Sequence, residues 1–369
     1  MGSGPAVRED AAAGPVPLLS IVVPCYNSAW IIDDTLLSLR HQTLCDTEIL
    51  IIDDGSTDDL GPVLAPHLAA DPRIRVIRQE NRGLAGARNR GLMEARAPYV
   101  GFIDADDLWH PRFAQTAVAA LEADPAAPYA FAYFFRLDTA NRVTAMPGWR
   151  TPPRHDFEGM LTLNAVGNGS AAIFRRDPVR DVGGFDEGMR ARGAWGAEDW
   201  KLCLRLAARG TPVLIPQPLI GYRWVEAGMS QGDPSRQMRA VRAVLSDIAV
   251  EFPQVTRRQV ADGQVTMNGW LMGAFLRKRP FRETLALLVE SYVRNPLWFT
   301  NPLLRELHRM KIANLLLGLT AAKKDPVTVD RLVLDGERPF AFIPDPGRLR
   351  EPHLAAAPLP LAENRTCES

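Results

Sequence analysis

The sequence lacks the features that mark several classes of protein. Its 369 residues include only four cysteines, Cys25, Cys45, Cys203 and Cys367, with no CxxC pair. This scattered spacing is typical of a reducing compartment and predicts free thiols. The 43 basic and 43 acidic residues cancel, so the overall charge does not favour nucleic acid as a partner. The longest apolar run, residues 312–319, is shorter than the roughly 20 residues that a membrane-spanning helix needs.

The order of predicted elements indicates an α/β protein. Residues 1–17 are rich in Gly, Ala and Pro and lack the apolar run of a secretory signal, so we expect a flexible leader. From residue 18, short β-rich runs alternate with helical patterns, which predicts a mostly parallel, Rossmann-like central sheet flanked by helices. The expected strands are 18–23, 48–52, 73–77 and 99–103, with later strands at 129–136 and 212–215.

The character of the chain changes near residue 233. We expect the main domain to span 18–232 and a helical extension that carries Arg and Lys to span 233–323. Residues 324–369 combine proline and charge with few large apolar side chains, which predicts a loosely packed or disordered tail. Two roles are open for the extension, contact with a membrane surface and assembly of a homo-oligomer.

Three carboxylates end the predicted strand at 99–103. Asp104, Asp106 and Asp107 lie within four residues, and such crowding is costly unless a cation neutralises it. In open parallel sheets, ligands bind at the carboxyl ends of the strands. Hard oxygen ligands suit Mg²⁺ or Mn²⁺ shared with a diphosphate. The alternative is a solvated acidic turn.

Polar residues also follow the first two predicted strands. After the first strand, Tyr26 could stack on a base or lie in an ordinary surface loop, and Asn27 is a candidate cap, with Ser28, for the next helix. After the second, Asp53 and Asp54 could accept hydrogen bonds from a base or a ribose, or form a turn and a helix cap. Arg88, near a glycine-rich helix start, could contact a phosphate or the base.

A fifth motif combines residues 183–187 with Glu198 and Asp199 at a predicted helix start. A helix N-terminus favours ionised carboxylates, so this pair could supply a general base, although acidic residues are common at helix starts. Trp149 and Trp195 are candidate platforms for an acceptor, with buried packing as the alternative for each.

These five elements, in this order over residues 18–224, resemble the family 2 inverting glycosyltransferases (GT2) with the GT-A fold. The resemblance implies that Asp106 ligates the metal, that Asp104 approaches the ribose and metal-bound water, and that Asp199 is the base beside Glu198. It implies Mn²⁺ or Mg²⁺ as cofactor. The implied nucleotide-sugar site comprises Pro24, Tyr26, Asn27, Asp53, Asp54, Arg88, Asp104 and Ala105.

One position departs from the family pattern. Many relatives carry a metal-binding histidine two residues beyond the arginine of a Tyr-Arg pair, whereas here Tyr222-Arg223-Trp224 is followed by Val225. Glu226 could substitute, or the metal could depend on Asp106, the diphosphate and water.

The resemblance implies inverting transfer from a nucleoside-diphosphate sugar, with a UDP-sugar favoured, to a hydroxyl of a glycan, lipid-linked or small-molecule acceptor. The scattered cysteines lead us to expect a cytoplasmic location, with peripheral contact at the inner face of the membrane as an option. The rivals are a metal-dependent phosphohydrolase of the haloacid dehalogenase type, suggested by Asp104-Ala-Asp106, and a non-catalytic nucleotide-sugar-binding module, suggested by Val225.

Overall fold

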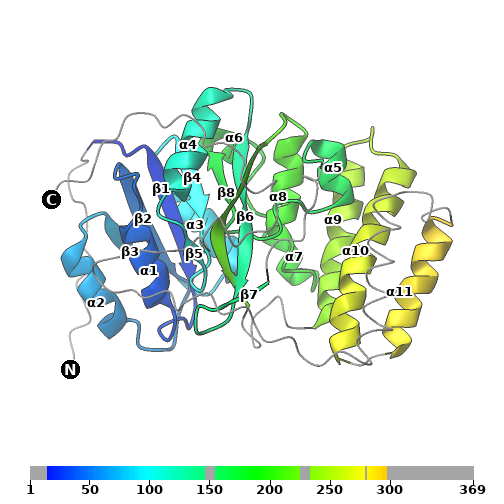
Figure 1. Cartoon of the computed structure of the whole chain (residues 1–369), viewed down its shortest axis with the longest axis horizontal. Coiled ribbons are helices and arrows are strands. Elements are labelled where there is room, and N and C mark those ends of the chain that lie inside the picture. The colour runs from blue at the N-terminus through cyan, green and yellow to red at the C-terminus, as the bar shows by residue number, and fades with distance from the viewer. Residues whose placement is uncertain (1–14, 146–153, 225–232, 279–280, 297–369) are drawn as a thin grey trace, which may run out of the picture.

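The computed structural model describes residues 15–145, 154–224, 233–278 and 281–296 (Figure 1). One sheet runs through the domain in the order β3-β2-β1-β4-β8-β6-β9-β5, with β7 paired to β6. Its strands are β1 (Leu19–Cys25), β2 (Thr47–Asp53), β3 (Ile74–Arg78), β4 (Tyr99–Phe102), β5 (Leu108–Trp109), β6 (Tyr129–Leu137), β7 (Val143–Ala145), β8 (Ala172–Arg175) and β9 (Val213–Arg223).

The first four strands are parallel, as predicted, and all lie within two residues of their expected bounds. Every residue of β1 and β2 is buried, because helices cover both faces of a parallel sheet. Beyond β4 the sheet is mixed: β8 is antiparallel to β4 and β6, whereas β6 and β9 are parallel. The α/β architecture of the sequence prediction is confirmed, with the parallel arrangement concentrated in the first half.

The strand β9 is much longer than the expected segment 212–215. It continues to Arg223 through Pro216 and Pro218, which lack a backbone donor. Its register with β6 shifts twice, around Tyr133, and such irregularities accommodate residues that cannot complete a ladder. This extension brings Tyr222 and Arg223 to the edge of the sheet where β4 ends.

The helices are α1 (Ile32–Arg40), α2 (Gly61–Ala70), α3 (Gly83–Glu94), α4 (Phe113–Ala123), α5 (Phe157–Thr162), α6 (Arg176–Asp181), α7 (Gly188–Ala191), α8 (Glu198–Ala207), α9 (Pro234–Glu251), α10 (Arg257–Lys278) and α11 (Phe281–Arg294). The expected caps of α1 are wrong: its N-cap is Ile31, without a side-chain cap. Asn27 adopts a left-handed φ of 51° and its side chain binds the next loop instead.

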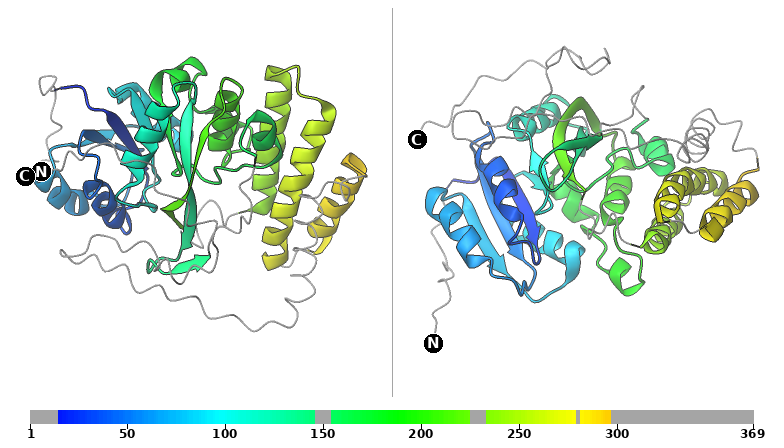
Figure 2. Two further views of the ribbon diagram at one scale, coloured as in Figure 1. Left: turned by 45° about the horizontal axis from the view of Figure 1, so that its top comes forward. Right: turned by 60° about the horizontal axis from the view of Figure 1, so that its bottom comes forward.

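The helices α9, α10 and α11 lie together at the end of the molecule opposite β3 (Figures 1 and 2). Apolar residues of α9, including Val244 and Ile248, are fully buried. Charged contacts accompany them: Lys201 Nζ in α8 lies 2.7 Å from Asp186 Oδ2 and 2.6 Å from Asp247 Oδ2 in α9. The helical start of the predicted extension is therefore packed against the domain.

Two further predictions concern cysteines and membrane spans. Cys25 and Cys203 are buried free thiols, as predicted, whereas Cys45 is disulfide-bonded. The prediction of a free thiol is therefore wrong for Cys45, because spacing along the sequence alone does not determine which thiols pair. Cys367 lies outside the described residues. In the part of the chain that the structure describes, no helix is both long and apolar enough to cross a bilayer.

Candidate active site

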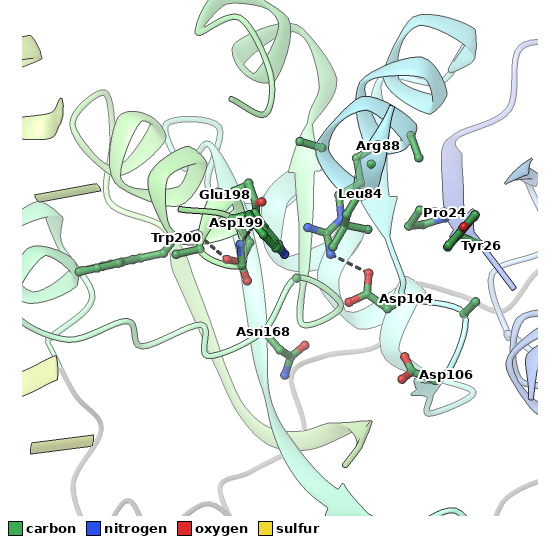
Figure 3. Close-up of a pocket in the computed structure, with 18 of the residues that line it drawn as sticks. Pro24, Tyr26, Leu84, Arg88, Asp104, Asp106, Asn168, Glu198, Asp199 and Trp200 are labelled. Atoms are coloured by element: carbon green, nitrogen blue, oxygen red, sulfur yellow. Dashed lines mark hydrogen bonds and ion pairs between the residues drawn. The ribbon is translucent and has the colours of Figure 1, made fainter. Parts of the chain in front are cut away.

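A cleft of about 970 Å³ lies at the carboxyl ends of β1, β2 and β4. The loop after β1, Asp54, the start of α3 and residues 104–106 line one side. Residues 163–169, 195–200 and 222–224 line the rest, together with Arg236 and Gln237 of α9 and Met267 of α10. Segments from almost the whole described chain, including the helical extension, therefore meet at this cleft (Figure 3).

The three carboxylates after β4 have different surroundings. Asp104 and Asp106 line the cleft. Asp107 is fully buried, where its Oδ2 accepts a 2.5 Å hydrogen bond from Ser170 Oγ and its Oδ1 accepts a 2.9 Å bond from Arg223 N. The side chain of Asp107 therefore holds two cleft-forming loops together.

Burial, together with the neighbouring charge of Asp104, raises the pKa of Asp106 to about 6, although Arg223 opposes the shift. Burial and the same two carboxylates hold the pKa of Asp107 well above its ordinary range. The turn that carries them is fixed by Thr35 Oγ1, which donates to Ala105 O at 2.8 Å. Ala105 lines the cleft beside its neighbours. The cluster thus concentrates negative charge that a cation would relieve.

The donor set in the cleft fits Mg²⁺ or Mn²⁺. These hard cations accept one or two protein carboxylates and complete their shell with water and phosphate oxygens. Asp104 and Asp106 supply such a pair, and among the described residues no group of three or more His, Cys, Asp or Glu could hold a metal ion. Val225, which stands where many relatives carry the histidine, and Glu226, its candidate substitute, lie outside the described residues.

A buried arginine links the acidic turn to the opposite wall. Arg88 Nη2 donates a 2.6 Å hydrogen bond to Asp104 Oδ1. Burial alone would lower the pKa of Arg88, but the charges of Asp104, Asp199 and Glu198 raise it above its ordinary value. Arg88 is therefore held as a cation between Asp104 on one side and Asp199 and Glu198 on the other.

The Glu-Asp pair begins α8, as predicted. Glu198 is buried, and its Oε2 accepts a 2.9 Å bond from Gly196 N. Asp199 faces the cleft, and Figure 3 shows it on the wall opposite Asp104 and Asp106. Burial raises the pKa of Asp199, with a further increase from Asp104, whereas Arg88 lowers it. Asp199 is thus a carboxylate whose basicity exceeds that of an exposed aspartate.

The two aspartates at the end of β2, Asp53 and Asp54, point in different directions. Asp54 lines the cleft, and its carboxylate accepts 2.8 Å bonds from Arg82 N and Gly83 N at the start of α3. Asp53 Oδ1 accepts a 2.8 Å bond from Ser56 N, and Asp53 is not among the residues that line the cleft. Successive side chains at the end of a strand face opposite sides, so the structure does not bring Asp53 to the site.

The loop after β1 forms the rim of the cleft. Pro24 and Tyr26 both line it, and Tyr26 is 51% exposed. Asn27 Oδ1 accepts a 2.8 Å bond from Thr57 N, which ties this loop to the loop after β2. Trp30 is a second exposed aromatic residue on the same rim, and sequence reasoning missed it.

Of the two tryptophans predicted to border the acceptor, the structure describes Trp195. Trp195 is half-buried and lines the cleft, with the guanidinium of Arg236 from α9 lying 5.2 Å from its ring centre. Trp149 lies outside the described residues. Within the nearby motif at 183–187, Glu187 lines the cleft. Asn89 exchanges hydrogen bonds of 2.8 and 2.9 Å with the backbone of Phe185, which fixes α3 beside the segment that leads to α8.

Comparison with known proteins identifies the segment that carries these residues. Residues 20–183 match the family model described as glycosyl transferase family 2. The chain carries a glycosyl transferase family 2 segment. The matched segment includes the strands from β1 to β8 and ends before Glu198 and Asp199.

Curated proteins similar to this chain include several that are named as glycosyltransferases. Validoxylamine A glucosyltransferase of Streptomyces hygroscopicus subsp. jinggangensis is 32% identical over 241 residues, which cover 55% of this chain and 54% of the relative. The uncharacterized glycosyltransferase EpsJ of Bacillus subtilis is 47% identical over 92 residues, 25% of this chain and 27% of the relative. The chain therefore spans about half the length, or less, of these relatives.

Solved structures confirm the GT-A fold around the family 2 segment. S. aureus TarS 1-349 in complex with UDP-GlcNAc superposes with a TM-score of 0.57 at 17% identity, covering 81% of this chain and 92% of that one. The mannosyltransferase PcManGT from Pyrobaculum calidifontis, in complex with GDP-Man and Mn²⁺, gives a TM-score of 0.50 at 20% identity, covering 82% and 87%. At these identities the likeness concerns the fold.

Sequence reasoning gave no site role to three residues around the family 2 cleft. Ser170 is fully buried, and its Oγ accepts a 3.0 Å bond from Asp104 N besides donating to Asp107. The side chain of Arg223 is buried, and its Nη2 donates to Asp34 and Asn141, while its Nε and Nη1 have no partner. Asn168 lines the cleft. In the sequence, Asn168 and Ser170 stand out only through Asn168-Gly-Ser170, which matches the acceptor pattern for glycosylation and indicates no role in a cleft.

Proposed function

We propose that this protein is an inverting glycosyltransferase that moves a sugar from a nucleoside-diphosphate sugar to an acceptor hydroxyl. One observation carries the proposal: a metal-compatible carboxylate pair and a candidate base occupy opposite walls of one cleft, with the cation of Arg88 between them. The chemistry needs this separation, because the leaving group and the attacking acceptor lie on opposite faces of the sugar. The family 2 match and the GT-A fold support the same reading.

The donor would occupy the side of the cleft formed by β1, β2 and β4. Tyr26 and Pro24 would border the base. The Asp54 carboxylate accepts three hydrogen bonds, from Gln79, Arg82 and Gly83. Because a carboxylate has about four lone-pair positions, it can still accept one hydrogen bond from an N–H group of the base. We favour a UDP-sugar as donor.

The diphosphate would lie beside Asp104 and Asp106. These carboxylates would hold Mn²⁺ or Mg²⁺ together with phosphate oxygens, and the bound ion would offset charge on the departing nucleoside diphosphate. Arg223, whose charge acts on Asp106, adds a fixed positive charge to this end of the cleft. It offers a physical reason why a chain with Val225 in place of a histidine could still retain the diphosphate.

Asp199 would act on the acceptor. It removes the proton from the acceptor hydroxyl as that oxygen bonds to the anomeric carbon, while the bond from that carbon to the diphosphate oxygen breaks. Trp195 and the adjoining residues of α9 would border the acceptor, which we expect to be a glycan, a lipid-linked sugar or a small molecule. Synthesis of a polysaccharide, glycolipid or other glycoconjugate, in the cytoplasm or at the inner membrane face, remains the expected context.

The test begins with calorimetry of UDP and GDP, with and without Mn²⁺, followed by hydrolysis assays with UDP-glucose, UDP-GlcNAc and GDP-mannose. Asp199→Asn should keep nucleotide affinity and lower turnover by about 10²- to 10⁴-fold, because it removes only the base. Asp106→Ala should instead remove the Mn²⁺-dependent part of the nucleotide affinity, because it removes a ligand.

Three outcomes would contradict the proposal. Retained turnover in Asp199→Asn would remove the assigned base. Nucleotide binding by the wild type without hydrolysis of any donor would favour a non-catalytic module. Phosphate release from p-nitrophenyl phosphate without nucleotide affinity would favour the phosphohydrolase.

A further inference from the structure

Asn168 is the uncharged residue among the cleft-lining side chains that keep a buried polar atom without a partner, beside Arg88 and Arg223. Asn168 is 5% exposed, and its Nδ2 makes no hydrogen bond. Its Oδ1 accepts a 3.0 Å bond from Ser170 N, and only the oxygen of an amide can accept from a backbone N–H. The orientation of the amide is therefore fixed, and the NH₂ group is the end left without a partner. Buried donors are almost always satisfied in folded proteins, so this NH₂ group calls for a partner that the described residues do not supply.

The loop that carries Asn168 is held firmly against the site. Ser170 Oγ bridges Asp104 N and Asp107 Oδ2, at 3.0 and 2.5 Å. Gly169 packs so closely on Arg88 that a Cβ there would lie 2.4 Å from Arg88 Nη2. The position of Asn168 is therefore coupled to Asp107, which joins two cleft-forming loops, and to Arg88, which links the acidic turn to the opposite wall.

Asn168 lines the same cleft as the metal-compatible carboxylates and the candidate base. In Figure 3 it is drawn between Asp199 on one side and Asp104 and Asp106 on the other. A sugar joined to a diphosphate beside Asp106 and attacked by an acceptor beside Asp199 has to span the space between these walls. A sugar ring presents several hydroxyl oxygens, each able to accept a hydrogen bond from an amide N–H.

We propose that Asn168 Nδ2 donates a hydrogen bond to a hydroxyl of the transferred sugar, which makes Asn168 a specificity-determining residue. The inference rests on the proposed function. A site with a buried donor discriminates strongly against an analogue that lacks the matching acceptor, because the donor is then left unpaired. Asn168 would therefore select among donor sugars, and would have little effect on the affinity for the nucleotide alone.

Two variants remove the amide donor. Asn168→Ser keeps an oxygen that can accept the bond from Ser170 N, since serine forms the same local turn, but it is too short to replace Nδ2. Asn168→Ala removes both groups. Circular dichroism and UDP calorimetry with Mn²⁺ establish whether each variant is folded and retains the nucleotide site.

UDP-glucose, UDP-GlcNAc and GDP-mannose are first tested to find the donor that the wild-type protein hydrolyses. The measurement is then kcat/KM for hydrolysis of that donor and of its single-deoxy analogues. In Asn168→Ser, kcat/KM for the complete donor should fall about tenfold or more, while the UDP Kd changes less than about threefold. One deoxy analogue should lower wild-type kcat/KM by a similar factor and cause little further loss in the variant, because both changes remove the same bond.

Other results overturn the inference. If every deoxy analogue has the same relative effect in both proteins, Asn168 does not contact the sugar. If UDP affinity and turnover fall together in Asn168→Ser as well as in Asn168→Ala, the side chain only supports the loop. If the wild type neither binds UDP or GDP nor hydrolyses a donor, the proposed function itself fails, and the inference with it.

Discussion

Three aspartates follow β4, and the surrounding side chains separate their roles. Asp107 is buried against Ser170 and Arg223, whereas Asp104 and Asp106 face the cleft. The sequence was enough to predict that carboxylates gather at this strand end. It could not show which of them turn inward, because that depends on partners such as Ser170 and Arg223, which are distant in sequence.

The environment of Asp199 predicts the acid side of the pH profile. Burial and Asp104 raise its pKa above the ordinary 3.8, although Arg88 opposes them, and Glu198 and Cys203 lie near it. A base acts only when ionised, so kcat should be lost as the pH falls through the raised pKa, at a pH above 3.8. The measurement is kcat for donor hydrolysis against pH, with UDP calorimetry over the same range to separate loss of the base from loss of the donor site. Full activity down to pH 3.8 would contradict the assignment.

At the scale of elements, the regular patterns were predictable and the irregular ones were not. The first four strands lie close to their expected bounds, and α3 and α8 begin at the predicted helix starts, because apolar periodicity and flanking breakers define these elements locally. The strand β9 was underestimated, since its prolines argue against a strand and only pairing with β6 sustains it. Asn27 was misassigned as a helix cap because its true partner, Thr57, lies in another loop.

Removing the charge of Lys201, between α8 and α9, should have a large effect on the free energy of unfolding. Lys201 is buried between Asp186 and Asp247, and removing one member of a buried ion pair leaves the others uncompensated. Lys201→Met should lower the free energy of unfolding by about 3 kcal/mol, because it leaves the two carboxylates without their buried cation. Arg192 still pairs with both carboxylates and limits the loss.

The matched control is Arg90→Met. Arg90 forms a surface pair with Glu94 one turn away in α3, and such pairs contribute less than about 1 kcal/mol. Urea unfolding of both variants gives the comparison. Equal losses would show that the charges between α8 and α9 do not fasten the extension.

At the scale of the whole molecule, the sequence indicated a helical extension but not its contribution to the cleft. The extension carries Arg236 and Gln237 into the same cleft as Tyr26. Tertiary packing of this kind leaves no local pattern, because the periodicity of α9 shows that one face is buried without showing against what.

Packing of α9 can be tested with two valines of the same helix. Val244 is fully buried and Val250 is 78% exposed. Val244→Asp should lower the free energy of unfolding by about 4 kcal/mol or more, because a carboxylate replaces an apolar group in the core. Val250→Asp should cost less than about 1 kcal/mol. Urea unfolding followed by circular dichroism compares them, and similar small losses would mean that α9 does not pack on the domain in solution.

The distance in sequence between the two rims of the cleft has a consequence during synthesis. Tyr26 and Arg236 both line the cleft, but α9 is made long after β1. At about 5–20 residues per second, a ribosome needs roughly 10 to 40 s to pass from one to the other. During that interval the nascent chain already exposes the loop that would receive a nucleotide, while the wall that closes the cleft has yet to be translated.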